Sequence, residues 1–414
     1  MKQDNFIVYG YRWIVLVAFM FIVAITQLLW ITFAPITGDA ANFYNVPDLS
    51  IGLLSMSFMI VYIVVSIPAS WVIDTYGIRV GVGIGAVLTA VFGLLRGVWA
   101  SNYTLVLIAQ IGVAIGQPFV LNAVTTVAAR WFPVRERATA SGLGSLAMYL
   151  GIFLGLALTP YLTIHFQIGG MLFAYGIASV VCAVIFIVFA RERPATPPCA
   201  PGMDVRSLVF DGFKQMLRQK EFILLLIIFF IGLGTFNAVT TWIEDIVRPN
   251  GFSSTQAGFI GGLMIVGGIL GALVMPTLSD HYRKRTPFII MALVGATLGL
   301  AGIAYATSYW LLLVAAFIMG FFLLSAGPIG FQYGAETTYP TPEGTSNGLL
   351  ILMGQISGIV FIFAMDSFKS PATGSMTFSL VVLIILMFLS LVLSFFLKEP
   401  KTLLTEPVKP ADAA

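Results

Sequence analysis

The chain has 414 residues, of which 59% are hydrophobic and only 9% are charged. A soluble domain carries about 25% charged residues because its surface must be hydrated, so this composition excludes a water-soluble globular protein. The formal net charge is +3, but the basic residues lie in short segments between apolar stretches, which excludes a nucleic-acid partner on distribution.

Apolar stretches of about 20 residues, the length of a helix that crosses a bilayer, recur along the whole chain. The twelve predicted spans are 11–37, 50–74, 78–99, 104–130, 137–163, 168–191, 221–247, 255–280, 286–307, 310–337, 344–368 and 375–397. The segment before the first span is short and polar, and we expect no cleavable signal peptide there. The two cysteines, Cys182 and Cys199, form no disulfide framework.

The spans divide the chain into two bundles with a linker between them. The predicted regions are an N-terminal six-helix bundle (1–191), a cytoplasmic linker (192–220), a C-terminal six-helix bundle (221–398) and a disordered cytoplasmic tail (399–414). Residues 204–220 place apolar residues at helical spacing with basic ones between them, which predicts an amphipathic helix on the membrane surface. A regulatory docking segment is the alternative interpretation.

Orientation follows from the distribution of Lys and Arg, which favour cytoplasmic loops. With a cytoplasmic N-terminus, all but three of the 21 Lys and Arg residues lie inside; the exceptions are Arg96, Arg248 and Lys369. We therefore expect a multi-pass protein of the cell membrane with both termini in the cytoplasm.

An internal repeat relates the two halves. Asp74-Thr-Tyr-Gly-Ile-Arg79 after the second span returns as Asp280-His-Tyr-Arg-Lys-Arg285 after the eighth, shifted by 206 residues. The same shift carries Arg130 onto Glu336 and Arg137 onto Glu343, where the sign of the charge is inverted. Self-similarity at one offset indicates duplicated units. The predicted fold class is an all-α membrane protein whose 12 transmembrane helices form two pseudo-symmetric six-helix bundles.

Two such parallel repeats are the layout of the major facilitator superfamily. The loop after the second span resembles that family in Asp74, Gly77 and Arg79, although Ala69 or Ser70 replaces the usual leading glycine. The segment from Arg130 to Arg137 resembles the family's loop after the fourth helix. The resemblance implies the major facilitator fold and transport by alternating access.

The charged residues of these loops predict a cytoplasmic gate, since a carboxylate at a helix end can face helix N-termini of the other half. The expected gating residues are Asp74, Arg79, Arg130, Arg137, Asp280, Arg285, Glu336 and Glu343. The alternative is that such charges only set topology, which we favour for Arg135. Glycines spaced by four predict close, smooth helix contact between the halves, which agrees with a rocking mechanism. These glycines are Gly151 and Gly155, Gly258 and Gly262, Gly267 and Gly271.

Polar residues near the bilayer centre are costly, and each is therefore a candidate for substrate binding. The predicted substrate-binding set is Gln27, Trp30, Phe33, Gln117, Asn122, Asn237, Tyr333 and Gln355. Aromatic faces at Trp30 and Phe33 can hold a cation through the ring quadrupole. The alternative is that a Phe-rich bundle places aromatic rings near every point.

No Asp, Glu or Lys lies near the middle of a span, which favours a neutral site and facilitated diffusion. The alternative is a proton-coupled symporter or an exporter that uses Glu244, Asp245 or Arg96, while Asp366 and Arg248 are expected to be interfacial charges. His, Cys, Asp and Glu form no cluster within the spans, so we expect no enzyme, no cofactor and no metal site. A non-transporting sensor or receptor would need a sizeable cytoplasmic domain or a long signalling tail, and the sequence predicts neither.

Several stretches resemble the feline leukaemia virus subgroup C receptor-related family. They are Gln27–Phe33, Phe58–Arg79, Gly116–Phe119 and Glu336–Gly358. The resemblance implies a carrier of choline or ethanolamine, and haem export has also been described for the family. It implies binding by a Trp and two Gln, here Trp30, Gln117 and Gln355. Asn237 stands where the family has Tyr, so one aromatic wall of the site is missing here. The expected substrates therefore include a different small amine, or a neutral polar metabolite held by the Gln and Asn amides. We expect a small-molecule substrate, a lipid bilayer as the surroundings and a monomeric state.

Overall fold

The computed structural model describes residues 8–133, 136–194, 196, 216–338 and 343–400, and every regular element in them is a helix. The predicted amphipathic helix at 204–220 and the predicted disordered tail at 399–414 lie mostly outside the described residues. The prediction of an all-α fold is confirmed.

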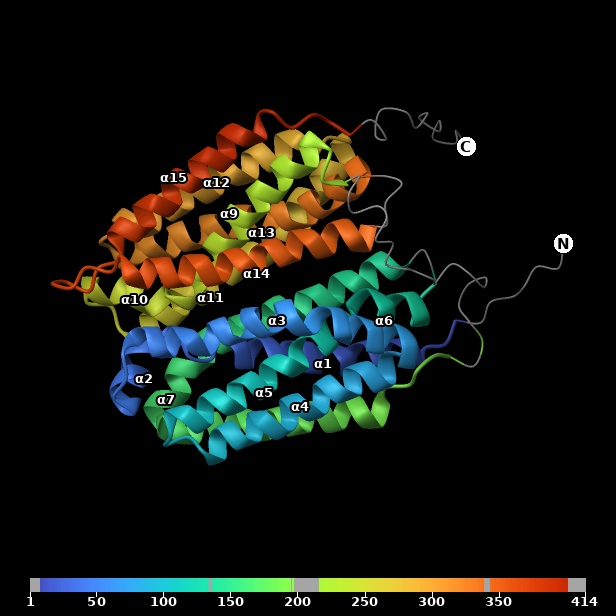
Figure 1. The fold of residues 1–414 in the computed structure, drawn as a ribbon, viewed down its shortest axis with the longest axis horizontal. Coiled ribbons are helices and arrows are strands. Elements are labelled where there is room, and N and C mark those ends of the chain that lie inside the picture. Colours follow the sequence, from blue (N-terminus) through green and yellow to red (C-terminus); the bar gives the residue numbers. More distant parts are fainter. Residues whose placement is uncertain (1–7, 134–135, 195, 197–215, 339–342, 401–414) are drawn as a thin grey trace. The chain divides into compact units, whose positions relative to one another are not determined.

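The first half of the chain contributes seven α-helices and one short 3₁₀ helix (Figure 1). They are α1 (Tyr11–Ile31), η1 (Ala34–Ile36), α2 (Thr37–Tyr44), α3 (Asp48–Tyr76), α4 (Ile78–Val98), α5 (Tyr103–Leu121), α6 (Val124–Trp131) and α7 (Arg137–Phe189). The second half contributes α9 (Lys220–Thr241), α10 (Ile243–Val247), η3 (Arg248–Asn250), α11 (Ser254–Tyr282), α12 (Thr286–Tyr305), α13 (Tyr309–Thr338), α14 (Glu343–Ser367) and α15 (Thr377–Ser394).

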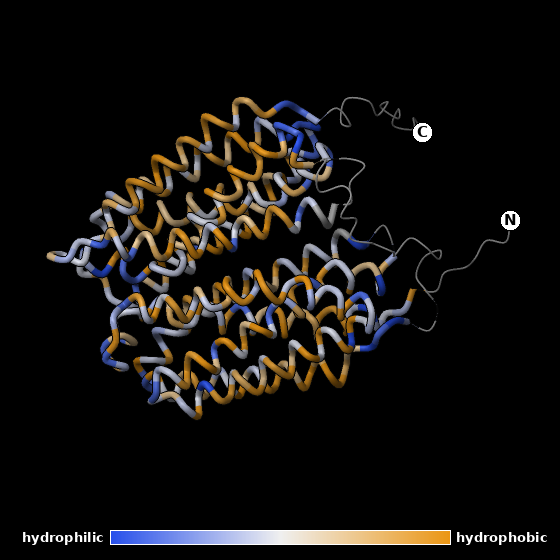
Figure 2. The backbone as a smooth tube through the Cα atoms, in the orientation of Figure 1, coloured by the Kyte–Doolittle hydropathy of each residue, from blue (hydrophilic) through white to orange (hydrophobic). Residues whose placement is uncertain are grey.

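Eleven helical segments of the described residues are long and apolar enough to cross a membrane. The longest, α7, contains the fifth and sixth predicted spans, because the chain turns within it at Gln167, whose φ is 60°. The predicted twelve crossings are therefore present. Hydrophilic residues gather at the ends of the helices and apolar residues along their lengths (Figure 2).

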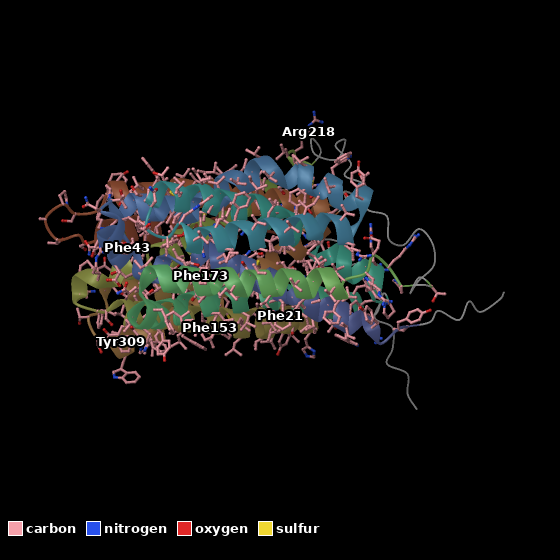
Figure 3. All side chains as sticks on the ribbon, turned by 90° about the horizontal axis from the view of Figure 1, so that it is seen from below. Phe21, Phe43, Phe153, Phe173, Arg218 and Tyr309 are labelled. Atoms are coloured by element: carbon pink, nitrogen blue, oxygen red, sulfur yellow. The ribbon has the colours of Figure 1, made fainter. Side chains whose placement is uncertain are left out.

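Side chains on the outside of the first-half helices are apolar. Phe21, Phe43 and Phe173 are between 45% and 47% exposed and project from the helix surfaces in Figure 3. Exposure of large apolar side chains in water would create an aggregation-prone patch, so these positions indicate contact with lipid.

The chain divides into two compact units. Unit 1 comprises residues 1–205, 237–265 and 358–377, and unit 2 comprises residues 206–236, 266–357 and 378–414. Within unit 1, α1 and α4 pack on α7, and α5 packs on α3 and α4. Within unit 2, α12 packs on α13.

Three predicted spans are interrupted in the structure. The chain leaves the helix after Ile31, after Leu121 and after Thr241, and then enters η1, α6 and α10. The breaks after Ile31 and Thr241 both lie near the C-terminal end of their spans, the first and the seventh. Interrupted helices leave carbonyl groups without intrahelical donors, and these groups need partners from elsewhere in the fold.

All three glycine pairs make close helix contacts, but only Gly258 and Gly262 make them between the halves, as predicted. Gly151 and Gly155 of α7 lie against the backbone of α1, and Gly267 and Gly271 of α11 lie against the backbone of α13. Gly258 and Gly262 lie against α7, where Gly258 contacts the carbonyl oxygen of Leu156. Close approach of this kind strengthens van der Waals packing, which drives helix association where lipid surrounds the protein.

Substitution of Gly151 by Ala tests the α1–α7 contact. A Cβ atom at this position would overlap the carbonyl group of Ala24, and overpacking of this kind costs about 1–3 kcal/mol of unfolding free energy. We expect a lower thermal unfolding midpoint of the detergent-purified protein. Gly142→Ala on the same helix is the matched control, since nothing lies within 4 Å of its Cβ position. Equal midpoints for the two variants would contradict the contact.

Candidate functional site

Three predicted substrate residues are buried within the first-half bundle of unit 1. Trp30 in α1 is 6% exposed, and its indole N–H donates to the carbonyl oxygen of Ser55 at 3.2 Å. Gln27, one turn earlier in α1, and Gln117 in α5 are also buried. The structure describes no hydrogen bond from either Gln side chain, although buried amides normally find partners. Two buried amides without protein partners are suited to binding a polar solute.

Two further predicted substrate residues are engaged by the fold itself. Phe33 is buried, and the guanidinium of Arg96 lies 5.7 Å from its ring centroid. The side chain of Asn122, at the break after α5, accepts a hydrogen bond from the Tyr62 hydroxyl at 2.8 Å and donates to Ser66 and to Ser70 at 2.9 Å. These two positions serve the architecture around the site.

The remaining predicted residues lie on second-half helices. Asn237, near the end of α9, lies in unit 1 beside Gly358 of α14. Gln355 is half-buried on α14 in unit 2. Tyr333 is fully buried in unit 2, where its hydroxyl donates to the carbonyl oxygen of Lys398 at 2.8 Å.

A cluster of charges joins the start of α3 to second-half segments at one end of unit 1. Asp48 accepts from Arg248 at 2.7 Å and from Lys369 at 2.5 Å, and Asp245 accepts from the same two cations at 2.5 and 2.7 Å. Glu244 pairs with Arg248 at 3.2 Å and accepts from the Gly38 backbone N–H at 2.9 Å. We call these five side chains, Asp48, Glu244, Asp245, Arg248 and Lys369, the Asp48 latch.

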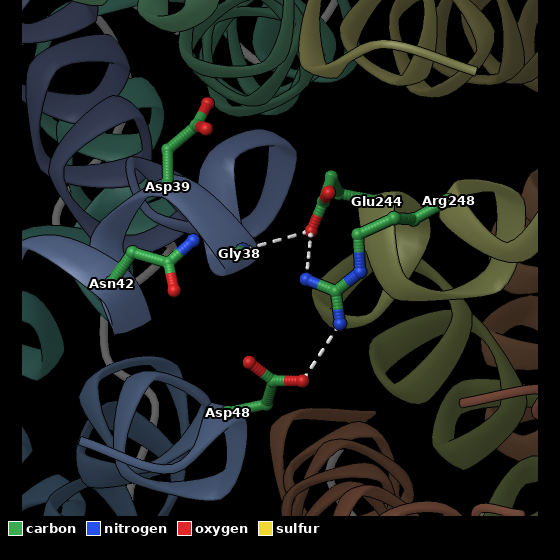
Figure 4. Close-up of a pocket in the computed structure, with 6 residues that line it drawn as sticks. All are labelled: Gly38, Asp39, Asn42, Asp48, Glu244 and Arg248. Carbon is green, nitrogen blue, oxygen red and sulfur yellow. Dashed lines mark hydrogen bonds and ion pairs between the residues drawn. The ribbon is translucent and has the colours of Figure 1, made fainter. Parts of the chain in front are cut away.

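A polar cavity of about 280 Å³ adjoins the Asp48 latch. Figure 4 shows Arg248 between Glu244 and Asp48, with Asp39 and Asn42 of α2 also on the cavity wall. Three carboxylates and one guanidinium line it, so the cavity favours cations over anions.

Burial and charge pairing oppose each other in the latch. Burial raises the pKa of Asp245, against the effect of Lys369 and Arg248, and it likewise raises the pKa of Glu244. Burial alone would lower the pKa of Lys369, but Asp245 and Asp48 outweigh it and the pKa is raised. The pKa of Arg248 is raised by the same carboxylates despite burial. Both cations therefore stay charged.

Tight helix contacts accompany the latch. A Cβ atom at Gly52 of α3 would lie 2.8 Å from the ring of Trp242, and one at Gly358 would lie 2.6 Å from the Met59 sulfur. Trp242 is fully buried and donates to the carbonyl oxygen of Ile362 at 3.0 Å. First-half and second-half helices of unit 1 are thus in direct contact at these two positions.

The first-half residues of the predicted cytoplasmic gate lie at the other end of unit 1. Arg130 forms an ion pair with Glu192, whose carboxylate also accepts from the backbone N–H groups of Ile78 and Arg79 at 3.2 and 2.8 Å. The side chains of Asp74 and Arg79 are exposed, and Arg137 donates to the carbonyl oxygen of Phe132. The carboxylate of Glu192 thereby caps the positive end of α4.

The second half repeats this arrangement in unit 2. Glu399 accepts from the backbone N–H groups of Arg285 and Thr286 at 2.9–3.1 Å and caps α12. Arg285 pairs with Glu336 at 3.0 Å and with Asp280. Burial alone would lower the pKa of Arg285, but these carboxylates raise it. Glu343 is the first residue of α14, and its side chain lies outside the described part of the chain.

Sequence reasoning missed Glu192 and Glu399 as well as the latch. In each half, the capping glutamate follows the two backbone N–H groups that it binds by 113 and 114 residues. The internal repeat therefore also relates Glu192 to Glu399, at an offset one residue longer than 206. Arg248 was expected to be an interfacial charge, and its binding to three carboxylates was not predicted. Arg248 and Lys369 both lie outside the predicted cytoplasmic set of Lys and Arg residues, and this exception was the sequence feature that could have identified the latch.

Comparison with known proteins agrees with the fold and the repeat. The sequence profile of the Major Facilitator Superfamily matches residues 15–362. Solute carrier family 49 member A3 of Danio rerio is 31% identical over 383 residues, which cover 89% of this chain and 80% of that protein. The choline/ethanolamine transporter flvcr2b of Danio rerio is 28% identical over 395 residues, covering 88% and 80%. A bacterial homologue of the human lysosomal transporter Spinster superposes with a TM-score of 0.76 at 16% identity, covering 97% of this chain and 99% of its own.

Replacement of Lys369 by Met tests the Asp48 latch. Asp48 and the buried Asp245 would then share Arg248 alone, and an unpaired buried acceptor costs about 1–3 kcal/mol. We expect a lower thermal unfolding midpoint, partly recovered in Lys369→Met/Asp245→Asn, which also removes the uncompensated charge. Lys398→Met is the control, because that side chain is exposed. A Lys369→Met midpoint equal to that of the control would show that the latch adds no stability.

Proposed function

The chain belongs to the Major Facilitator Superfamily, and we propose that within it the protein carries a small amine or choline-like cation by facilitated diffusion. It is a multi-pass membrane protein and a secondary transporter of a small organic solute. The observation that carries the substrate proposal is the burial of Trp30, Gln27 and Gln117 within one bundle, with no hydrogen bond described for either amide side chain. An aromatic face binds a cation through its quadrupole, and the amides bind hydroxyl or ammonium groups.

The relatives support the amine class. Several are named choline/ethanolamine transporters, from fish and mammals, at 27–29% identity over 85–94% of this chain. Gln355, which lies in unit 2, remains a proposed substrate-binding residue because the family resemblance implies it. Asn237 supplies an amide where the family has an aromatic ring, so we propose that the cation is smaller or more polar than choline.

Alternating access is the proposed mechanism. The Asp48 latch and the contacts at Gly52 and Gly358 support a state closed at that end. The excess of Lys and Arg at the opposite helix ends supports a cytoplasmic location for the Glu192 and Glu399 caps and for both termini. We propose the cell membrane as the location and a monomer as the working unit. Asp74, Arg79, Arg137, Glu343 and the paired residues around the two caps remain the proposed cytoplasmic gate.

Proton coupling is the second candidate. The observation that favours it is the burial of Glu244 and Asp245, because burial raises the pKa of both carboxyl groups. Both are bound to Arg248 in the latch rather than placed beside Trp30, which favours a gating role over a role in coupling.

A thermal-shift screen tests the binding site. Purified protein is heated with choline, ethanolamine, amino acids or carboxylates, and we expect stabilisation by the amines. Loss of one cation–π wall is worth about 0.5–2 kcal/mol, so Trp30→Ala is expected to weaken binding roughly threefold to thirtyfold. Gln355→Ala is expected to weaken it as well. A ligand that stabilises wild type and both variants equally would place the site elsewhere.

Uptake into liposomes tests the coupling mechanism. Since Glu244 and Asp245 are held by Arg248 in the Asp48 latch, labelled ethanolamine is expected to equilibrate across the membrane at the same initial rate with and without a pH gradient. Accumulation above the equilibrium level that depends on the gradient would replace the facilitative mechanism with proton coupling.

A further inference from the structure

Arg96 is a fully buried charge that the proposed transport mechanism does not use. It lies in the last turn of α4 and is 0% exposed. No carboxylate among the described residues pairs with it. A buried charge is costly unless it is paired, so the presence of an arginine here requires a physical reason.

Arg96 finds two of its partners, one carbonyl group and one hydroxyl group, at the break in α1. Its guanidinium donates to the carbonyl oxygen of Leu29 at 2.9 Å and to the Thr32 hydroxyl at 3.3 Å. The negative end of the α1 dipole lies at this break and partly balances the cation. A glycine at position 93 brings α4 close to this point, since a Cβ there would lie 3.3 Å from the Leu29 side chain.

Gln110 of α5 completes the arrangement. Its amide oxygen accepts from Arg96 at 2.6 Å, and its amide nitrogen donates to the carbonyl oxygens of Leu29 and Leu54 at 3.3 Å. Arg96 and Gln110 therefore tie the end of α1 to α3, α4 and α5 in a sealed polar network.

The network lies directly beside the proposed substrate residues. Trp30 follows Leu29 in the chain, and its indole N–H donates to Ser55, the residue after Leu54. Phe33 lies under the Arg96 guanidinium. One carbonyl group that Gln110 binds thus directly precedes Trp30 in the sequence, and the other directly precedes Ser55, the acceptor of the Trp30 indole N–H.

We propose that Arg96 and Gln110 are positioning residues that hold the α1 break and thereby fix the Trp30 ring for substrate binding. Stability alone does not account for the pair, because apolar residues of similar volume in place of buried charges are often neutral or stabilising. The inference rests on the proposed function only for the role of Trp30 in binding. The position of the ring is a separate, measurable property.

Transport by purified protein in liposomes gives the first test. In Arg96→Met/Gln110→Leu we expect an unfolding midpoint equal to or above that of wild type, with the KM for ethanolamine raised about tenfold and kcat changed much less. Arg96→Lys keeps the charge but offers one point of donation in place of the planar guanidinium, so it is expected to raise KM too. Arg218→Met is the matched control, since that side chain is exposed.

The second test needs no substrate. Protein labelled with 5-fluorotryptophan gives separate ¹⁹F resonances, and Trp30 and Trp242 are assigned by Trp30→Phe and Trp242→Phe. In the double variant we expect the Trp30 resonance to shift and broaden. The resonance of Trp242, equally buried and bonded to Ile362, should stay in place.

The outcomes separate the two proposals. A Trp30 resonance that is unchanged in a folded double variant overturns the positioning role, whatever is transported. A shifted resonance with an unchanged KM also overturns it, because ring position would then not affect binding. If wild type moves neither choline nor ethanolamine while the resonance shifts, the substrate proposal fails and the positioning of Trp30 by Arg96 and Gln110 stands.

Discussion

A charge inside a bilayer must find its partner within the protein, because hydrocarbon offers none. This constraint accounts for the environment of Arg96, which binds the carbonyl oxygen of Leu29 at the α1 break and the side chains of Thr32 and Gln110. Arg248 and Lys369, the other two cations outside the predicted cytoplasmic set, share Asp48 and Asp245. Cytoplasmic loops tolerate Lys and Arg through solvation, whereas these three positions retain a cation because a specific set of oxygen atoms surrounds it. The position of these three cations outside the predicted cytoplasmic set was therefore the sequence feature that pointed most directly to buried or paired charges.

The fold was predictable because each crossing requires a long apolar run, and the repeat fixed the order of the crossings. The breaks at Thr32, Asn122 and Trp242 were not predicted, since hydropathy on either side of them is the same. A helix interruption depends on donors from neighbouring helices, such as Gln110 for the carbonyl oxygen of Leu29, and no local pattern records them. The turn at Gln167 shows the converse, because the separation predicted between the fifth and sixth spans shrinks to one residue with non-helical angles.

The candidate site was predictable to the extent that depth in the membrane identifies polar residues. Depth does not say which way a side chain points. Gln27 and Gln117 were selected on the same grounds as Asn122. The side-chain amide of Asn122, however, is hydrogen-bonded to Tyr62, Ser66 and Ser70. Phe33 presents a ring to Arg96 rather than to a ligand. Helical phase and the neighbours on adjacent helices decide these cases, and a single sequence does not contain them.

The two kinds of charge cluster differ in what a rocking motion would do to them. The caps at Glu192 and Glu399 join residues of one half, so they persist when each half moves as a body. The Asp48 latch joins α3 to α10 and to the segment after α14, and must break whenever those helices separate. Its members other than Glu244 and Asp245 are 15–34% exposed, so water can replace the lost partners and the cost of opening is moderate. Buried pairs without such access would lock the carrier shut. The partial exposure of the latch therefore suits a contact that has to form and break in each transport cycle.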